Sequence, residues 1–287
     1  MNYREAYKFG EGILSDAGIT EAALDARLLL EFITGHDRNT LLAYPETSVS
    51  DSEVSKYESI VRKRAGHIPL QQLTGEFSFM GIDLYVNDKV LIPRQDSECL
   101  VEEAMRYVQD GSDILDLCTG SGCLLLSLMH YKNGCRGVGV DISADAVDVA
   151  NINRDRLEET GGLNGGCAEF IVGDLYDAIT PDKKFDVIIS NPPYIRTTDI
   201  EELMPEVRDH EPRMALDGGE DGLIFYRRIA QSAPDHLVRG GRIFFEIGYD
   251  QADAVSQILA EANFTDIEVI KDYTGNNRVV TGTHSQK

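Results

Sequence analysis

The chain has 287 residues, enough for one large domain or for a large and a small domain. Its hydrophobic content of 42% supports an ordinary core, and no segment approaches the ~20 apolar residues that a membrane span needs. The formal net charge of −22 argues against a protein that depends on nucleic-acid phosphates for its affinity, and it favours a protein partner.

The chain's cysteines and its first residues indicate its compartment. Five cysteines, an odd number without a Cys-x-x-Cys pair, predict reduced thiols, and residues 1–5 lack the pattern of a signal peptide. We therefore expect a cytoplasmic protein that contacts no membrane. Arg62-Lys63-Arg64 is the one compact basic cluster, and on a helix such a cluster is more often a solvated face than a nucleic-acid site.

Residues 1–75 have the pattern of a small helical bundle. Apolar residues recur at helical spacing from Tyr3 to Leu14, and residues 22–33 are apolar enough for a helix buried on most sides, ended by Gly35. The spacing of Ser50 and Glu53 is that of a capping box. We expect residues 1–73 to form an N-terminal helical domain that recognises the substrate; the alternative is a domain that only stabilises the chain.

Residues 74–92 are expected to form a β-hairpin linker. Two strand-like runs, 77–80 and 84–86, are separated by Gly81-Ile82-Asp83. The polar residues 95–98 then begin a helix. The main domain is expected to span residues 93–287.

The main domain alternates strands and helices. Its first strand, residues 113–117, runs into a glycine turn at 118–122 and then an apolar helix. Glycines let the backbone approach a ligand, and a helix N-terminus offers unpaired N–H groups. A dinucleotide fingerprint would need a further glycine where Leu125 stands, so the turn suits S-adenosylmethionine better than NAD. Asp116 is placed to reach the amino-acid part of that cofactor.

The next two strands end at acidic residues. Residues 137–140 lead to Asp141, which is placed to accept hydrogen bonds from both ribose hydroxyls; the alternative is an N-cap for the helix at 144–153. Residues 169–172 precede Asp174 and Leu175. We expect Asp174 to bond the adenine amino group and Leu175 to cover the ring.

The fourth strand ends at the most informative motif. The apolar run 185–190 stops at Asn191-Pro192-Pro193-Tyr194, because proline has no N–H to give to a sheet. The alternative is a strand followed by a proline turn that has no functional role. The motif resembles that of S-adenosylmethionine-dependent methyltransferases acting on planar nitrogens, either base amino groups or the glutamine amide.

The chemistry of such nitrogens explains these residue types. An amide nitrogen is a poor nucleophile because its lone pair is delocalised. The Asn191 side-chain oxygen and the Pro192 carbonyl, as two acceptors for the N–H hydrogens, would favour a pyramidal nitrogen. Tyr194 can pack against the planar group. The motif contains no strong general base, and we expect no metal ion.

A long segment to about residue 222 follows, which we interpret as a flap over the substrate pocket. Helices at 223–233 and 250–262 and strands at 242–247, 267–270 and 278–281 complete the sheet. The predicted fold class is α/β.

The whole chain resembles the HemK/PrmC family, the release factor glutamine methyltransferases. The resemblance rests on six segments: Thr74-Gly75-Glu76-Phe77, Leu91-Ile92-Pro93-Arg94, Asp116 to Gly122, Asn191 to Ile195, Glu211-Pro212-Arg213 with Asp217 to Gly222, and Glu246-Ile247-Gly248.

This resemblance implies a class I S-adenosylmethionine-dependent methyltransferase fold, Rossmann-like, with a seven-stranded sheet whose last strand is antiparallel. It implies N5-methylation of the glutamine in the Gly-Gly-Gln motif of class 1 peptide chain release factors, with S-adenosylhomocysteine as product. We expect a monomer that does not bind nucleic acid directly. The expected cofactor contacts are Asp116, Cys118, Thr119, Gly120, Ser121, Gly122, Asp141, Ile142, Asp174, Leu175 and Asn191. The expected catalytic residues are Asn191, Pro192 and Tyr194, and Pro193 joins them in holding the glutamine amide.

The chain departs from the family pattern in places. Gln95-Asp96-Ser97-Glu98 stands where Pro-(Asp/Glu)-Thr-Glu is usual, and we expect the Ser97 hydroxyl to keep the capping role. Family members commonly have glycine at Cys118 and an aromatic residue at Leu175. Two other functions stay open: an amino methyltransferase acting on adenine or guanine, and a non-catalytic subunit with this fold.

Overall fold

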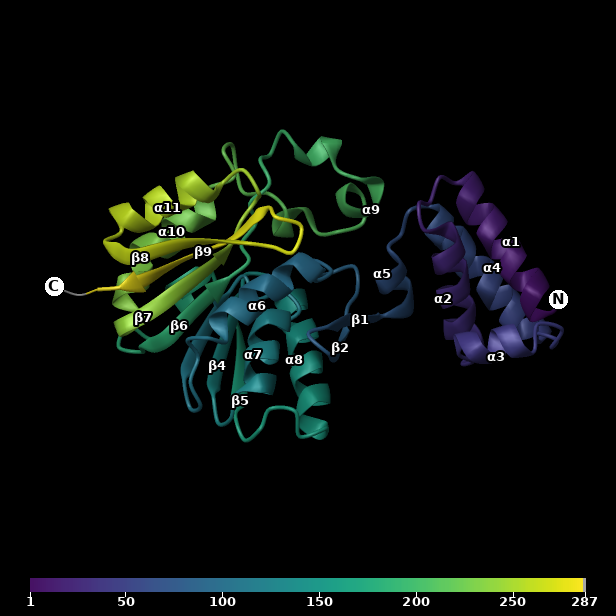
Figure 1. Ribbon diagram of the computed structural model, residues 1–287, viewed down its shortest axis with the longest axis horizontal. Coiled ribbons are helices and arrows are strands. Elements are labelled where there is room, and N and C mark those ends of the chain that lie inside the picture. The colour runs from purple at the N-terminus through teal and green to yellow at the C-terminus, as the bar shows by residue number, and fades with distance from the viewer. Residues whose placement is uncertain (286–287) are drawn as a thin grey trace. The chain divides into compact units, whose positions relative to one another are not determined.

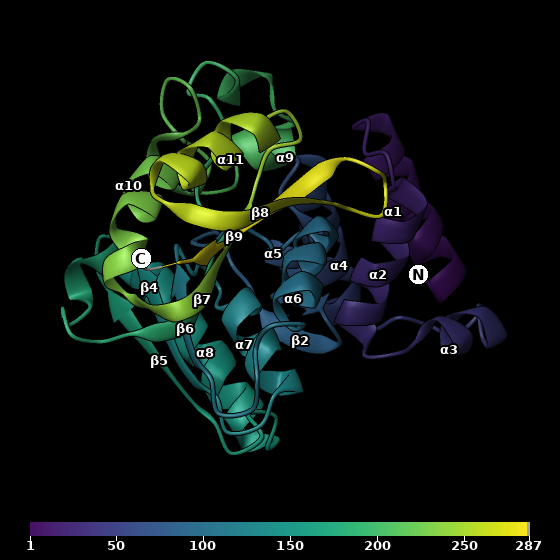
Figure 2. The same ribbon diagram turned by 60° about the vertical axis from the view of Figure 1, so that its left-hand side comes forward.

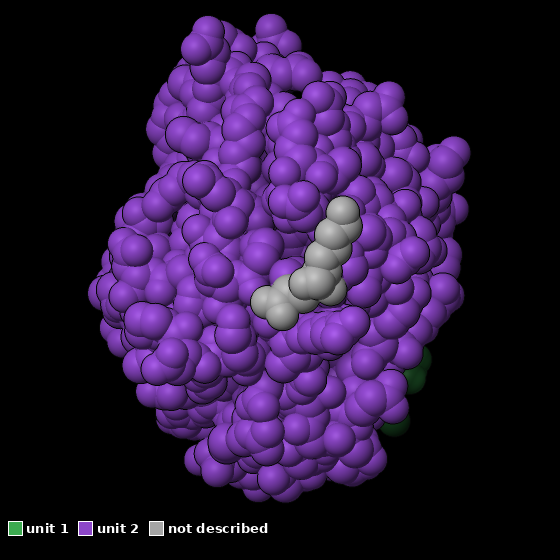
Figure 3. All heavy atoms as spheres, turned by 90° about the vertical axis from the view of Figure 1, so that its left-hand side faces the viewer, with its two compact units in different colours: residues 1–76, 204–210 green, residues 77–203, 211–287 purple. Residues whose placement is uncertain are grey.

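The structure is a computed structural model and describes residues 1–285. The chain divides into two compact units, coloured in Figure 3. The N-terminal unit comprises Met1–Glu76 and Met204–His210, and the sheet unit comprises Phe77–Leu203 and the chain from Glu211 onward. Within residues 1–285, no helix has the length and apolar character needed to cross a membrane.

Helices alone make up the N-terminal unit (Figure 1), and the three longest pack against one another. The helices within residues 1–76 are α1 (Tyr3–Asp16), α2 (Ala22–Thr34), α3 (Arg38–Ala43), α4 (Asp51–Ala65) and α5 (Leu70–Thr74). Asn2 and Ser50 form capping boxes at α1 and α4, and Gly35 ends α2 in the left-handed conformation. The caps at Ser50 and Gly35 confirm the predictions made for them.

Arg64 of α4 is buried between two carboxylates. Its Nε donates to Asp25 at 2.7 Å, and its other nitrogens donate to Glu206 at 3.2 Å. Glu206 lies on the short helix α9 (Pro205–Arg208), within the segment Met204–His210 that joins this unit. The expected solvated basic face is therefore wrong for Arg64, although Arg62 and Lys63 are exposed.

The sheet unit begins with a two-stranded hairpin, β1 (Glu76–Phe79) and β2 (Ile82–Tyr85). Met80 and Gly81 form its turn, with φ of 50° and 74°. Two central residues with positive φ are the mark of a type I′ hairpin turn. The hairpin was predicted, but Ile82 and Asp83, expected in the turn, belong to the second strand.

The main sheet has seven strands in the order β5-β4-β3-β6-β7-β9-β8. All strands are parallel except β9, which runs antiparallel to both of its neighbours. The predicted class of fold, with its antiparallel last strand, is confirmed. The strands are β3 (Asp113–Leu117), β4 (Arg136–Asp141), β5 (Cys167–Val172), β6 (Phe185–Ser190), β7 (Leu237–Glu246), β8 (Phe264–Lys271) and β9 (Asn277–His284).

Helices cover both faces of this sheet (Figures 1 and 2). One face packs against α6 (Glu98–Ala104), α7 (Cys123–Tyr131) and α8 (Ala144–Glu159), and the other against α10 (Ile224–Ser232) and α11 (Ala252–Glu261). Neighbouring residues of β3 enter different cores: Ile114 packs on the first side and Leu115 on the second. This alternation shows that both faces of the strand are covered, as is usual in a parallel sheet.

A short 3-10 turn, η1 (Gln95–Ser97), precedes α6. Ser97 is 2% exposed and makes no side-chain capping bond. Its hydroxyl lies instead near the carboxylate of Glu246, whose pKa it lowers. The predicted capping role of Ser97 is therefore wrong, because its buried side chain is directed towards β7 and makes no bond to the first amides of the helix.

The predicted flap, residues 195–222, contains three short helical turns: η3 (Ile200–Glu202), α9 and η4 (Arg213–Ala215). Residues 195–203 and 211–222 belong to the sheet unit, and only the part between them joins the N-terminal unit. Within that unit, the Gln72 amide donates to the His210 carbonyl at 2.8 Å and His67 Nδ1 lies 3.0 Å from Glu206. The two remaining 3-10 turns are η2 (Leu175–Ala178) and η5 (Ala233–Asp235).

Candidate functional site

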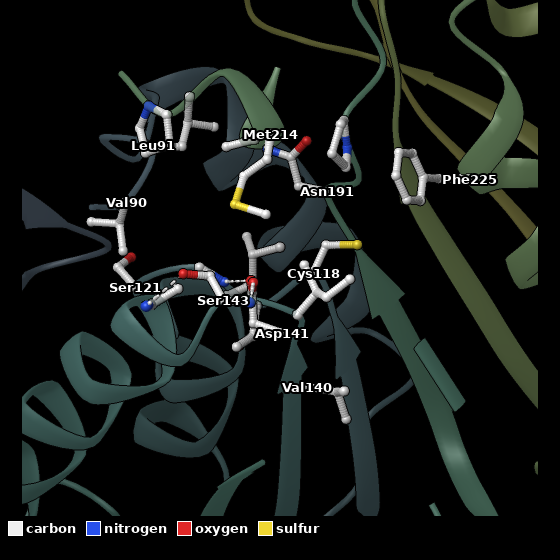
Figure 4. A pocket seen from close by; sticks show the side chains of 18 of the residues that line it. Val90, Leu91, Cys118, Ser121, Val140, Asp141, Ser143, Asn191, Met214 and Phe225 are labelled. Atoms are coloured by element: carbon white, nitrogen blue, oxygen red, sulfur yellow. Dashed lines mark hydrogen bonds between the residues drawn. The ribbon is translucent and has the colours of Figure 1, made fainter. Parts of the chain in front are cut away.

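A cavity of about 250 Å³ opens at the carboxyl ends of β3, β4, β5 and β6 in the sheet unit (Figure 4). This edge of an open parallel sheet is where ligands bind. Ten of the predicted site residues line it: Cys118, Thr119, Gly120, Ser121, Asp141, Ile142, Asp174, Leu175, Asn191 and Pro193. Asp116, Gly122, Pro192 and Tyr194 lie beside the cavity but do not line it.

The glycine turn after β3 has an unusual backbone. Cys118, Gly120 and Gly122 all have positive φ, at 60°, 56° and 78°. A side chain at Gly122 would place its Cβ 2.9 Å from Phe170, whereas a Cβ at Gly120 would meet open space. Gly122 is thus required for packing, and Gly120 leaves room above the backbone at the cavity. Burial raises the pKa of the Cys118 thiol, so this thiol stays protonated.

Asp141 ends β4 and holds the glycine turn. Its Oδ2 accepts from the Gly120 amide at 2.9 Å, and its Oδ1 accepts from the Ser143 amide at 3.0 Å. Burial raises the pKa of Asp141, and the bonds from these backbone amides oppose that rise. The N-cap of α8 is Ser143, whose hydroxyl accepts from Ala146. The alternative role of Asp141 as N-cap is therefore wrong.

Asp116 is fully buried behind the turn. Its Oδ2 accepts from the Thr119 hydroxyl at 2.6 Å, and its Oδ1 has no hydrogen-bond partner among residues 1–285. Burial raises the pKa of this carboxyl to about 7. A buried carboxylate with one free oxygen is costly, and this cost favours the protonated form of Asp116.

Asp174 and Leu175 form the wall that follows β5. Asp174 pairs with Arg228 at 2.9 Å, and Arg228 also lines the cavity. Leu175 is 7% exposed and has a φ of 54°, so the backbone itself turns at this wall. One Asp174 oxygen is thus engaged by a cation, an interaction that the sequence pattern did not reveal.

The motif at residues 191–194 is held from three sides. The Ser190 hydroxyl donates to the Leu117 carbonyl at 2.6 Å, which ties β6 to β3. The Gln251 amide donates to the Tyr194 carbonyl at 3.0 Å. A Cβ at Gly218 would lie 2.7 Å from the Tyr194 Cα, so this glycine lets residues 217–219 pack on the motif. Asn191 lines the cavity beside Met214 and across from Asp141 (Figure 4).

Tyr194 is half-buried and packs against the core on the side of the sheet covered by α10 and α11. Burial raises the pKa of its phenol, and the charge of Glu246 adds to the rise. The phenol therefore keeps its proton near neutral pH.

Sequence reasoning missed several residues of the cavity wall. Val90, Leu91 and Pro93 come from the connection after the hairpin, Met214 and Ala215 from η4, and Phe225 from α10. The segments containing Leu91, Pro93 and residues 211–222 were recognised as motifs without a role in the site. Arg94 and Glu211 connect two of these motifs through an ion pair of 2.7 Å.

No group of three or more His, Cys, Asp or Glu within residues 1–285 is arranged to hold a metal ion. The cavity instead combines a carboxylate at the end of β4, exposed backbone at a glycine turn and apolar walls. Such a set suits a ligand with a ribose, an apolar ring and a small charged group.

The amino-acid sequence of this chain is similar to those of known proteins. Residues 5–75 match the PrmC N-terminal domain, and residues 95–209 match the methyltransferase small domain. The release factor glutamine methyltransferase of Geobacter sulfurreducens is 38% identical over 97% of this chain and 95% of its own. That of Clostridium acetobutylicum is 39% identical over 89% of each chain.

Solved structures agree on the fold. A methyltransferase from Pyrococcus furiosus superposes with a TM-score of 0.52 at 18% identity, over 72% of this chain and 90% of its own. A 16S rRNA N2 G1207 methyltransferase from T. thermophilus, in complex with AdoMet and guanosine, superposes with a TM-score of 0.51 at 18% identity. The match covers 74% of this chain and 50% of its own. Both show the methyltransferase fold of the sheet unit. With its close relatives aligned over almost its full length, the chain belongs to the release factor glutamine methyltransferase family.

Proposed function

We propose that this chain transfers a methyl group from S-adenosylmethionine to the N5 side-chain amide of the glutamine in the Gly-Gly-Gln motif of class 1 peptide chain release factors. The observation that carries the proposal is that Asn191, at the end of β6, lines the same cavity as the Asp141 carboxylate at the end of β4. The residue proposed to bind the cofactor and the residue proposed to bind the amide thus line one cavity, in a chain of this family.

The residues present fit S-adenosylmethionine. Asp141 would accept from the ribose, Asp174 and Leu175 would border the adenine, and the open space above Gly120 would admit the ligand against the backbone. The Ser121 Oγ, which has no partner among residues 1–285, would give the amino-acid part a hydroxyl at the cavity wall, whereas Asp116 lies behind the turn and does not line the cavity. When bound, this group supplies an activated methyl on a sulfonium.

The protein's part in the reaction is to hold the amide. The Asn191 side-chain oxygen and the Pro192 carbonyl accept the two N–H hydrogens, and this localises the nitrogen lone pair. Fixed dipoles of this kind stabilise the transition state without a reorganisation cost. Pro192 and Pro193 are buried, and their rigid turn fixes where these acceptors point.

The release factor is the proposed protein substrate, and the N-terminal unit is the proposed substrate-recognition domain, with residues 1–73, 74–92 and 93–287 as functional divisions. We also propose that the chain acts as a cytoplasmic monomer. A basic nucleic-acid face at residues 62–64 has little support, because Arg64 is buried in ion pairs.

Transfer of labelled methyl from S-adenosylmethionine to purified release factor tests the function. The control is the same factor with Gln→Ala in its Gly-Gly-Gln motif, beside a nucleic-acid sample. Label on the wild-type factor alone is expected. Label on nucleic acid would contradict the proposal in favour of an amino methyltransferase of bases, and no label on either would favour a non-catalytic subunit.

A further inference from the structure

Glu246 is the last residue of β7 and lies next to the amide-binding motif. Ser190 of β6 pairs with Phe245 of β7 in parallel register, so Asn191 and Glu246 are the next residues of the two strands. Glu246 is 1% exposed. The nearby Ser97 hydroxyl lowers the pKa of its carboxyl, and its Oε2 has no hydrogen-bond partner among residues 1–285.

No ion pair joins this carboxylate to a cation within residues 1–285, although the charges of Arg278 and Arg94 lower its pKa. Arg278 is engaged by Asp272 at 3.0 Å and by Asp96 at 3.1 Å, and Arg94 by Glu211 at 2.7 Å. Burial raises the pKa of Glu246 to about 7. A buried, unpaired carboxylate costs stability, so Glu246 contributes little to holding the fold together.

The other groups that face Glu246 are poor bases or are already bound. Tyr194 and Cys123 have raised pKa values through burial and keep their protons. Tyr226 of α10 donates its hydroxyl to the Glu246 backbone carbonyl at 2.8 Å. Among these groups, the Glu246 carboxylate is the one that can take up a proton near neutral pH.

N-methylation of an amide releases a proton. The nitrogen forms a bond to the methyl carbon while the carbon–sulfur bond breaks and its electron pair stays on sulfur. The sulfonium charge disappears, and the amide, which began with two N–H hydrogens, keeps one. The second hydrogen has to leave the nitrogen as a proton, and neither Asn191 nor the Pro192 carbonyl is basic enough to accept it.

We propose that Ser97 and Glu246 form the exit for this proton. Ser97 lines the cavity together with Asn191 and Pro193. Its hydroxyl oxygen accepts the proton from the amide nitrogen while its own hydrogen passes to the Glu246 carboxylate, which then returns the proton to solvent. The inference rests on the proposed function, because it requires an N–H substrate at Asn191.

The first test compares Glu246→Gln with Glu268→Gln, an exposed glutamate of β8. The glutamine can still bond Ser97 but cannot take up a proton. We expect Glu246→Gln to lower kcat at pH 8 by about 10²-fold, the usual size of proton-transfer assistance. The wild-type kcat should fall as pH drops below about 7, and this fall should vanish in Glu246→Gln. Cofactor affinity, KM for the release factor and melting temperature serve as controls for folding and binding.

A second readout needs no turnover. In protein labelled with carboxyl-¹³C glutamate, one resonance should titrate near pH 7, and it should be missing from Glu246→Gln and present in Glu268→Gln. Ser97→Ala should lower kcat as Glu246→Gln does, and Ser97→Thr, which keeps a hydroxyl, should restore it.

An unchanged pH profile in Glu246→Gln, or a near-neutral resonance that persists in it, would overturn the proposal. The two failures are distinguishable. If wild-type protein binds S-adenosylmethionine but does not methylate the release factor, the proposed substrate is wrong. If wild-type protein is active and Glu246→Gln is equally active, only the proposed proton exit is wrong.

Discussion

The Asp141 carboxylate and the Gly120 amide join the ends of two neighbouring strands through a hydrogen bond of 2.9 Å. The Ser143 amide holds the second carboxylate oxygen at 3.0 Å. The carboxylate is therefore fixed in orientation before any ligand binds, and each oxygen keeps a lone pair that can accept from a hydroxyl. Preorganisation of this kind reduces the ordering cost of binding.

Asp141→Ala should weaken S-adenosylmethionine binding by roughly 1.5–3 kcal/mol, the range for a hydrogen bond to a charged group. Part of the loss comes from the glycine turn, which also loses its acceptor at Gly120. Calorimetric titration with the cofactor measures the effect. Asp145→Ala, an exposed position in the first turn of α8, is the matched control and should bind normally. An affinity equal to that of this control would show that Asp141 contacts no ribose.

Asn191→Ala should reduce methyl transfer by orders of magnitude and leave cofactor binding nearly intact, because we propose that its amide oxygen acts on the substrate nitrogen in the transition state. Single-turnover transfer to the release factor, with a separate binding titration, distinguishes the two effects. Asn276→Ala, exposed in the turn between β8 and β9, controls for loss of an asparagine. Near-normal turnover would remove the amide-polarising role.

Local signals in the sequence predicted much of the fold. Strand β3 has the predicted bounds, and the prolines at 192 and 193 follow the end of β6. Ser50 caps the start of α4 and Gly35 caps the end of α2. Each of these features depends on residues within a few positions of one another. The edge of the sheet that carries the site follows from the alternation of strands and helices.

Features set by distant contacts could not be predicted. The Ser97 hydroxyl looks like a helix cap until Glu246, some 150 residues later, is placed beside it. Arg64 looks solvated until Asp25 and Glu206 surround it. Cys118 has a positive φ that favours glycine, and only the usual glycine of the family hinted at it.

Asp116 should make stability depend on pH. Burial raises its pKa from 3.8 to about 7 in the folded protein. Between these pH values the folded state holds a proton that the unfolded state has released. The contribution of this proton to the free energy of unfolding is therefore complete below about pH 4 and is lost as pH rises through about 7. The loss is on the order of a few kcal/mol.

Melting temperatures of the cofactor-free protein at pH 5 and pH 8 test this dependence. Asp116→Asn removes the titrating group and should lessen the fall in melting temperature between the two values. Glu246 has a raised pKa in the same range, so the double variant Asp116→Asn, Glu246→Gln should flatten the profile further. A fall in Asp116→Asn as steep as in the wild type would show that Asp116 stays ionised when buried.

Arg64→Met should destabilise the N-terminal unit by about 3–5 kcal/mol, the usual effect of removing one partner of a buried ion pair. The substitution leaves Asp25, 6% exposed, without its cation, and it removes two of the bonds that Glu206 receives. Burial raises the pKa of Glu206, but the hydrogen bonds from His67 and Arg64 outweigh it and hold that pKa below its ordinary value.

Urea unfolding of the full chain, followed by helical circular dichroism, should show a first transition of Arg64→Met at a lower urea concentration than in the wild type. Arg62→Met removes an exposed arginine that pairs with Glu58 on the same helix and should change stability by less than about 1 kcal/mol. Equal midpoints for the two variants would mean that the buried pairs contribute no more than a surface pair.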